Sequence, residues 1–182
     1  KHDRDSMIYS DGAGAIIIEE SNEKGGILAH ETATFTLDEA HFIYFGETNN
    51  LEITDQRKYI KMYGRKIYEF ALTNVPIALK SCLDKSGVSI KDVKKILIHQ
   101  ANEKMDDAIV KRFYKLYDMD IPDGIMPMTI NTLGNSSVAT VPTLYDLILK
   151  RKLENQSIHK GDVIIFASVG AGMNINAIVY QY

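Results

Sequence analysis

The chain has 182 residues, of which 45% are hydrophobic, and 21 basic against 24 acidic residues give a net charge of −3. This length and composition suit one globular domain over residues 1–182, and the small acidic balance argues against a general nucleic-acid binder. No apolar run is long enough to cross a bilayer, and the single Cys82 excludes an intramolecular disulfide and fits a reducing, cytoplasmic environment.

The first third of the chain is predicted to contain strands. Residues 7–9, 15–19 and 27–35 are short apolar or β-branched runs, and we expect the third run to pair with the second. Gly12-Ala13-Gly14 lies between the first two runs. A dinucleotide fingerprint needs a third glycine and a following helix, so a strand here favours tight backbone packing over phosphate binding. Residues 36–55 are polar and irregular, which is typical of a surface excursion.

A long amphipathic helix is predicted over residues 56–86, because apolar side chains recur there at three- and four-residue spacing. Pro76 lies inside it and has no backbone N–H, so we expect a kink and a released carbonyl at Leu72. Gly87 is placed to end the helix. Cys82 shares the apolar stripe, which favours a small buried side chain over a nucleophile.

The second half of the chain alternates strands with helices. The same periodicities predict strands at residues 96–98, 163–167 and 173–180 and helices at residues 105–116 and 138–148. The run at 163–167 is apolar on both faces, as in a central strand, and the last strand is expected to be antiparallel to its neighbour. Strands that alternate with three helices indicate an α/β layer fold.

Two polar turns stand where ligands collect in such folds. His99 follows the strand at 96–98 directly, and open α/β sheets bind ligands at the carboxyl ends of their strands. Asn135 lies in a Gly-Asn-Ser-Ser turn before the third helix. A structural histidine and a turn or helix-capping asparagine are the simpler interpretations. No histidine spacing is typical of a metal site, so no metal is expected.

Four motifs carry a resemblance to a known family. They are Asp11-Gly12-Ala13-Gly14-Ala15, His99-Gln100-Ala101-Asn102, Gly134-Asn135-Ser136-Ser137 and Gly170-Ala171-Gly172. In this order and with similar separations they resemble the signatures of β-ketoacyl-acyl-carrier-protein synthase III. The resemblance covers nearly the whole chain. It implies a thiolase-like half: an α/β unit with a mixed five-stranded sheet, element order βαβαβαββ, and helices on both faces.

The resemblance implies a decarboxylative Claisen condensation of acyl-CoA with malonyl-acyl carrier protein in fatty acid biosynthesis. In that family a cysteine thiolate takes the acyl group from acyl-CoA, and the carbanion left by malonyl decarboxylation attacks it. His99 and Asn135 match the residues whose N–H groups stabilise the thioester enolate. Gly172 matches the glycine whose backbone N–H contributes to the other oxyanion hole. No cofactor is implied beyond the substrates acyl-CoA and acyl-carrier-protein phosphopantetheine.

The resemblance also implies partners. Lys104 falls where the family has a basic residue that helps to dock acyl carrier protein, and Lys111 and Arg112 extend the basic helix face. A plain solvated helix face explains the same charges. Asn102 matches a motif residue expected to contact the pantetheine arm. The implied partners are acyl-CoA, malonyl-acyl carrier protein and a second copy in a homodimer, with no nucleic acid and no membrane span.

Two features depart from the family pattern. Met173-Asn174-Ile175-Asn176 stands where the family has an aromatic residue and a closing glycine, which bears on substrate preference. The family's nucleophilic cysteine lies in its amino-terminal half, and its motif does not occur here. We therefore expect the chain to be the carboxy-terminal domain of a longer synthase, inactive alone.

Two other functions remain open at this point. One is a specialised ketosynthase or acyltransferase of secondary metabolism, which makes a pigment, lipid or polyketide. The other is a non-catalytic partner subunit that binds acyl carrier protein. A cysteine at a strand-to-helix turn in the upstream sequence would favour an enzyme.

Overall fold

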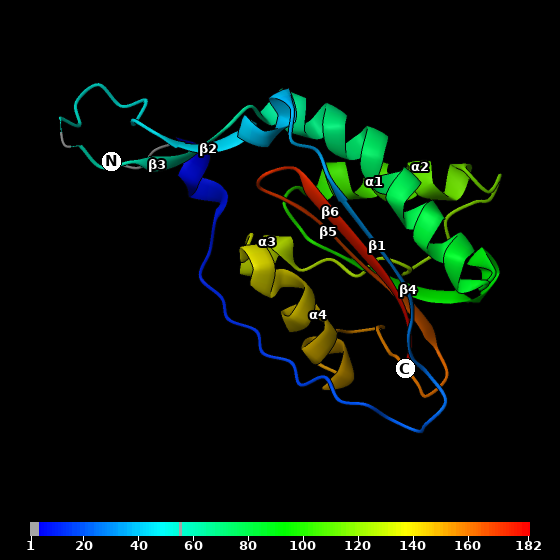
Figure 1. Ribbon diagram of the computed structural model, residues 1–182. Helices are drawn as coiled ribbons and strands as arrows, with labels where there is room; N and C mark the ends of the chain where they lie inside the picture. The colour runs from blue at the N-terminus through cyan, green and yellow to red at the C-terminus, as the bar shows by residue number, and fades with distance from the viewer. Residues whose placement is uncertain (1–3, 55) are drawn as a thin grey trace.

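The computed structural model describes residues 4–54 and 56–182, and a four-stranded mixed sheet of order β1-β6-β5-β4 lies at its centre (Figure 1). β4 and β5 are parallel, while β6 is antiparallel to both β5 and β1. The strands of this sheet are β1 (Gly26–Thr34), β4 (Val93–Ile98), β5 (Val163–Gly170) and β6 (Asn174–Gln181). A separate ribbon pairs β2 (Ile43–Gly46) with β3 (Tyr59–Met62).

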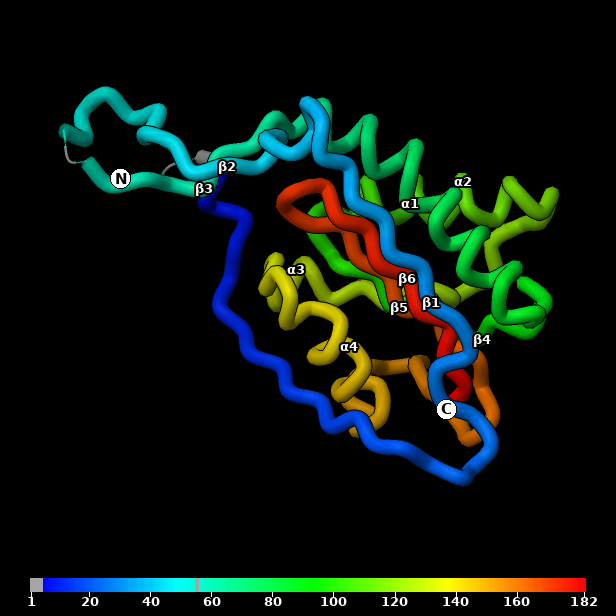
Figure 2. The backbone as a smooth tube through the Cα atoms, in the orientation of Figure 1, coloured from blue at the N-terminus to red at the C-terminus, as the bar shows by residue number. Residues whose placement is uncertain are grey.

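Helices cover both faces of the main sheet. The α-helices are α1 (Gly64–Ser86), α2 (Glu103–Lys115), α3 (Ile130–Leu133) and α4 (Thr140–Leu149). The short 3₁₀ helices are η1 (Arg4–Ile8), η2 (Asp38–His41), η3 (Ile90–Asp92) and η4 (Ser137–Ala139). α1 and α2 lie on one face and α4 on the other (Figures 1 and 2), so the predicted α/β fold class is confirmed. No helix of the described residues combines the length and apolar character needed to cross a membrane.

Each face of the sheet has its own apolar core, because successive side chains of a strand point to opposite faces. Ile96 and Ile98 of β4 belong to the core beneath α1 and α2, whereas Leu97 packs with Leu144 and Ile148 of α4. All five side chains are at most 1% exposed. Burying an aliphatic side chain of this size contributes about 1.5–3 kcal/mol. β4 therefore packs against the helices on both faces. This packing fixes the position of the strand and of His99, which follows it directly.

The first long helix is shorter than predicted, since it begins at Gly64 rather than at residue 56. Residues 59–62 instead form β3, with Ile60 opposite Phe45 of β2. The three-residue spacing of Ile60 and Tyr63 fits a helix, but pairing with β2 decides the conformation. Helical spacing alone does not locate the start of α1, because β2, the strand that pairs with residues 59–62, lies outside the helical pattern.

Two predictions about α1, the released Leu72 carbonyl and the buried Cys82, are confirmed, while the kink at Pro76 stays a prediction. The Leu72 carbonyl accepts a hydrogen bond from Nη1 of Arg112 at 2.9 Å, so α2 satisfies the group that Pro76 leaves without a helical donor. Gly87 caps the helix at a φ of +71°, a conformation that favours glycine. Cys82 is fully buried, and its Sγ donates to the Ala177 carbonyl at 3.4 Å.

Two strands predicted in the first third are not part of the sheet. Residues 4–8 form η1, and only Tyr9 makes an isolated bridge, to Asn135. Residues 15–19 pair with no strand of the described chain, so the main sheet has four strands where five were expected. β1 pairs with β6 rather than with the run before it. Local β-branched composition predicts an extended segment, but only a neighbouring edge makes it a strand.

The Gly-x-Gly turn serves close backbone packing, as predicted. A Cβ on Gly12 would come within 2.8 Å of the Ser136 Cβ, and a Cβ on Gly14 within 2.5 Å of the Pro142 Cγ. Contacts this short leave no room for a side chain. The two glycines therefore let the amino-terminal segment lie against the start of α4 and the turn that holds Asn135.

Residues 16–18 are expected to make the 182-residue chain self-associate. Ile16, Ile17 and Ile18 are 70%, 95% and 74% exposed, and exposed, unpaired β-branched segments are templates for strand pairing. Analytical ultracentrifugation at high concentration should detect species heavier than the 20.5 kDa monomer. Ile17→Lys should move the chain toward the monomer. A clean monomer of the unsubstituted chain at the same concentration would refute the expectation.

Candidate functional site

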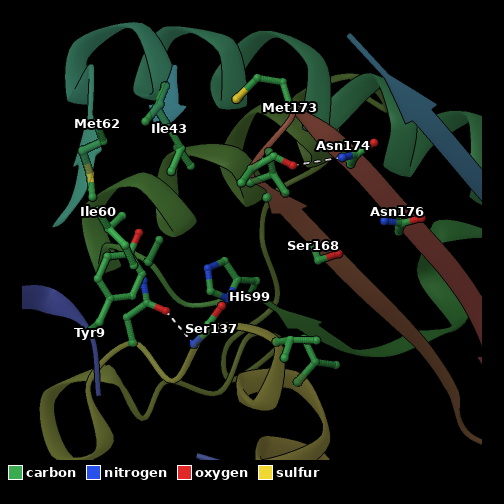
Figure 3. Close-up of a pocket in the computed structure, with 18 of the residues that line it drawn as sticks. Tyr9, Ile43, Ile60, Met62, His99, Ser137, Ser168, Met173, Asn174 and Asn176 are labelled. Carbon is green, nitrogen blue, oxygen red and sulfur yellow. Dashed lines mark hydrogen bonds between the residues drawn. The ribbon is translucent and has the colours of Figure 1, made fainter. Parts of the chain in front are cut away.

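A cavity of about 580 Å³ opens at the carboxyl ends of β4 and β5, and His99 and Asn135 both line it (Figure 3). Because β4 and β5 are parallel, their carboxyl ends meet at one sheet edge. The β2–β3 ribbon contributes apolar lining side chains, including Ile43, Ile60 and Met62. The structure thus brings the two predicted polar turns to one largely apolar cavity.

His99 is half-buried directly after β4. Its backbone N–H donates to the Ala167 carbonyl of β5 at 2.8 Å, which extends the ladder by one residue. Burial lowers the pKa of the imidazole, and the Ser137 backbone partly opposes that shift. A lowered pKa keeps the ring neutral at pH 7, and a neutral imidazole carries one N–H donor and one acceptor nitrogen.

Asn135 is held from several sides and is only 2% exposed. Its backbone N–H donates to the Ile8 carbonyl at 3.3 Å, and its carbonyl accepts from the Ser10 N–H at 2.9 Å. The side-chain Oδ1 accepts from the Ser137 N–H at 2.9 Å, the bond dashed beside Ser137 in Figure 3. With the oxygen engaged, the carboxamide NH₂ is the group left to donate.

Ser137 meets both candidate residues through its backbone. Its N–H donates to the Asn135 Oδ1, and its backbone partly opposes the lowering of the His99 pKa. Its φ of +55° lies in the left-handed region, which is uncommon for a residue with a side chain. The neighbouring Gly134 has a φ of +69°, and a Cβ there would lie 3.1 Å from the Ser10 Cβ. This turn is therefore fixed both by its own conformation and by the amino-terminal segment.

Asn102 and Gly172 have defined but different places. Asn102 is the N-cap of α2, where its Oδ1 accepts from the Met105 N–H at 3.2 Å and leaves its NH₂ available. Gly172 turns the chain between β5 and β6 with a φ of +73°. Ala171 and Met173 line the cavity, but Gly172 is not among the lining residues. The oxyanion role of Gly172 therefore stays a prediction.

The basic residues of α2 do not all face the same way. Lys104 and Lys111 are exposed, and their seven-residue spacing places them on one side of the helix with Lys115. Arg112 differs because its guanidinium binds the Leu72 carbonyl of α1. Lys104 and Lys111 are thus the members of the set that point away from the helix pair.

Tyr9 is a cavity residue that the sequence reasoning missed. It reaches the site because residues 8 and 10 hydrogen-bond to Asn135, more than 120 positions later. The only local signal was its place at the end of an apolar run followed by a turn, the same pattern that singled out His99.

Within residues 4–54 and 56–182, no group of three or more His, Cys, Asp or Glu side chains could hold a metal ion.

Comparison with known proteins gives a consistent family. Residues 83–182 match the family described as 3-oxoacyl-[acyl-carrier-protein (ACP)] synthase III C terminal. The chain is 32% identical over 188 residues to the beta-ketoacyl-[acyl-carrier-protein] synthase III of Porphyra umbilicalis, covering 99% of this chain and 54% of that protein. The Lactobacillus helveticus enzyme of the same name is 27% identical, with 97% and 53% covered.

Solved structures agree with the sequence matches. The 3-oxoacyl-[acyl-carrier-protein] synthase III of Aquifex aeolicus superposes with a TM-score of 0.71 at 26% identity, over 90% of this chain and 46% of that one. The Thermus thermophilus synthase III shares the fold with a TM-score of 0.73 at 22% identity, over 91% and 49%. The chain therefore spans about half the length of the relatives that it matches.

Proposed function

The chain belongs to the 3-oxoacyl-[acyl-carrier-protein] synthase III family, and on that premise we propose that it is the carboxy-terminal catalytic domain of a decarboxylative condensing enzyme. The proposed reaction joins the acyl group of an acyl-CoA to malonyl-acyl carrier protein, as in fatty acid biosynthesis. One observation carries the proposal: His99 and Asn135 line one cavity, and the Ser137 N–H holds the Asn135 Oδ1, so the carboxamide NH₂ is left to donate. The Asn135 NH₂ and the N–H of the neutral His99 ring are the two donors proposed for a ligand.

The proposed chemistry starts with loss of carbon dioxide from the malonyl thioester. The bond between the α-carbon and the carboxylate breaks, and its electron pair spreads onto the thioester oxygen as an enolate. N–H groups of His99 and Asn135 donate to that oxygen, and preorganised donors of this kind are worth about 3–4 kcal/mol each. The α-carbon then attacks an acyl thioester, a carbon–carbon bond forms, and a thiolate leaves.

The acyl thioester is proposed to sit on a cysteine outside this chain. Cys82 is unsuited to the role because it is fully buried on α1, and burial raises the pKa of its thiol. A thiol that resists ionisation is a poor nucleophile. Since the chain spans about half of its relatives, the other half of a full-length enzyme is the proposed source, and the family resemblance favours a homodimer.

Malonyl decarboxylation by the full-length enzyme tests the proposal. Carbon dioxide should be released from malonyl-acyl carrier protein, with a condensed product when acyl-CoA is present. No release would favour a non-catalytic subunit that binds the carrier protein. A panel of acyl-CoA donors separates fatty acid synthesis from a specialised ketosynthase. Met173 and Asn174 line the cavity where the family has other residues, so the preferred acyl-CoA is expected to depend on them.

Carrier-protein docking is proposed at Lys104 and Lys111, with Asn102 offering its NH₂ to the pantetheine arm and Arg112 contributing charge nearby. Lys104→Glu/Lys111→Glu should raise the KM for malonyl-acyl carrier protein about tenfold with kcat nearly unchanged, because exposed charges mainly steer encounter. Added salt should reduce the difference in KM between the double variant and the unsubstituted enzyme, because salt screens exposed charges. Lys91→Glu is the control, since the exposed Lys91 precedes β4, at the opposite end from His99. An unchanged KM in the double variant would contradict the docking site.

A further inference from the structure

Gln100 is a fully buried polar residue that the proposed reaction does not use. It follows His99 directly, has no exposed surface, and is not among the residues that line the cavity. A buried carboxamide is costly unless its donors and acceptor find partners. The hydrogen-bond partners of the Gln100 side chain therefore indicate its role.

The side-chain hydrogen bonds of Gln100 all go to the segment that leads to Asn135. Its Nε2 donates to the Pro127 carbonyl at 2.8 Å. Its Oε1 accepts from the Thr129 backbone N–H at 2.8 Å and from the Thr129 hydroxyl at 3.1 Å. The side chain thus ties the residue after His99 to the chain just before α3.

Thr129 passes this constraint on to Asn135. It is the N-cap residue of α3, and its hydroxyl makes no capping bond but donates to Gln100. Its carbonyl accepts from the Leu133 N–H at 2.9 Å, and α3 ends at Leu133, two residues before Asn135. A single helical turn is therefore the only spacer between the Gln100 contact and the carboxamide.

Only a carboxamide fits this position. Glutamine offers a donor to one partner and an acceptor to the other from the same planar group. An ionised glutamate would face the Pro127 carbonyl with a second oxygen, and an apolar side chain would leave the buried Thr129 N–H without its partner.

We propose that Gln100 is a positioning residue, which sets the separation of the His99 imidazole and the Asn135 carboxamide by fastening one turn to the other. This inference rests on the proposed function, because the separation matters only if both groups serve one oxygen. A displacement of about 1 Å at such a site can cost about 100-fold in rate.

The test compares Gln100→Met with Lys95→Met. Lys95 is a buried side chain of β4 whose Nζ donates to the Gly124 carbonyl at 2.6 Å, so its replacement also removes a buried hydrogen bond but leaves both turns tied. In the full-length enzyme, Gln100→Met should lower kcat for malonyl decarboxylation about 10- to 100-fold with KM within about twofold. Lys95→Met should leave kcat within about twofold at a comparable loss of thermal stability.

A second readout does not depend on activity. In the same full-length enzyme, the His99 pKa measured by NMR titration should rise toward its ordinary value in Gln100→Met, because a loosened turn admits water. It should not change in Lys95→Met. Thr129→Val, which removes one of the three bonds, should shift both readouts in the same direction by less. Equal effects of Gln100→Met and Lys95→Met would overturn the positioning role. A moved His99 pKa in an enzyme without decarboxylase activity would instead reject the proposed function and leave the tie between the turns standing.

Discussion

Replacing Asn135 with alanine is expected to lower kcat for malonyl decarboxylation by the full-length enzyme about 100- to 1,000-fold. The variant removes the carboxamide donor, while the backbone bonds of residue 135 to Ile8 and Ser10 do not depend on the side chain. Charge grows on the thioester oxygen only as carbon dioxide leaves, so the loss should fall on kcat rather than on substrate binding. His99→Ala should have an effect of similar size.

Two further variants make the Asn135 experiment specific. Asn135→Asp keeps the shape and the bond to the Ser137 N–H but puts an oxygen where the donor was, so it should be at least as damaging as alanine. Ser136→Ala alters the same turn, removing a hydroxyl contact with Thr140 at 3.3 Å, and should stay within about threefold of the unsubstituted enzyme. Decarboxylation that survives Asn135→Ala at full rate would reject the enolate role.

Replacing Asp106 with asparagine is expected to raise the free energy of unfolding by about 4 kcal/mol at pH 7 and by almost nothing at pH 4. Asp106 lies in the first turns of α2, has no exposed surface, and neither carboxyl oxygen has a hydrogen-bond partner in the described chain. Burial is the largest cause that raises its pKa to about 8, with repulsion from Asp107 adding to it. The backbone of Asn102 opposes this only in part.

The sign of the pH dependence follows from where the proton is held. In the unfolded chain the Asp106 carboxyl ionises near 3.8, whereas in the folded chain it keeps its proton up to about pH 8. Between these values ionisation favours the unfolded state, so the unsubstituted chain loses stability as pH rises. Asparagine has no such proton, and its buried amide resembles the neutral acid.

Denaturant unfolding of both chains at pH 4 to 8 measures the Asp106 difference. Asp120→Asn is the control, because it neutralises an exposed carboxylate that does not contribute to the Asp106 pKa shift and should change stability by less than about 0.5 kcal/mol. A difference between Asp106→Asn and the unsubstituted chain that does not change across this pH range would contradict the buried, protonated state of Asp106.

The sequence alone determined the features that depend on neighbours a few residues away. Helical spacing and the glycine after it located the end of α1, and Pro76 marked the carbonyl that Arg112 satisfies. The alternation of β4 between two cores follows from its unbroken apolar run, and its end placed His99 at the sheet edge. These signals are local because side-chain periodicity and backbone donors act within one turn or one strand.

Only the tertiary structure decided what depends on partners far along the chain. Residues 15–19 have strand composition but no partner edge, β1 pairs with β6 across the length of the chain, and residues 8–10 reach Asn135. In the sequence, Gln100 is only one member of the His-Gln-Ala-Asn motif. Its bonds to Thr129 form only when the folded chain brings the His99 turn beside the segment that leads to Asn135. A β-branched run favours an extended backbone that needs a partner strand, and a buried carboxamide needs hydrogen-bond partners. Which partner each one finds depends on contacts between residues far apart in the chain.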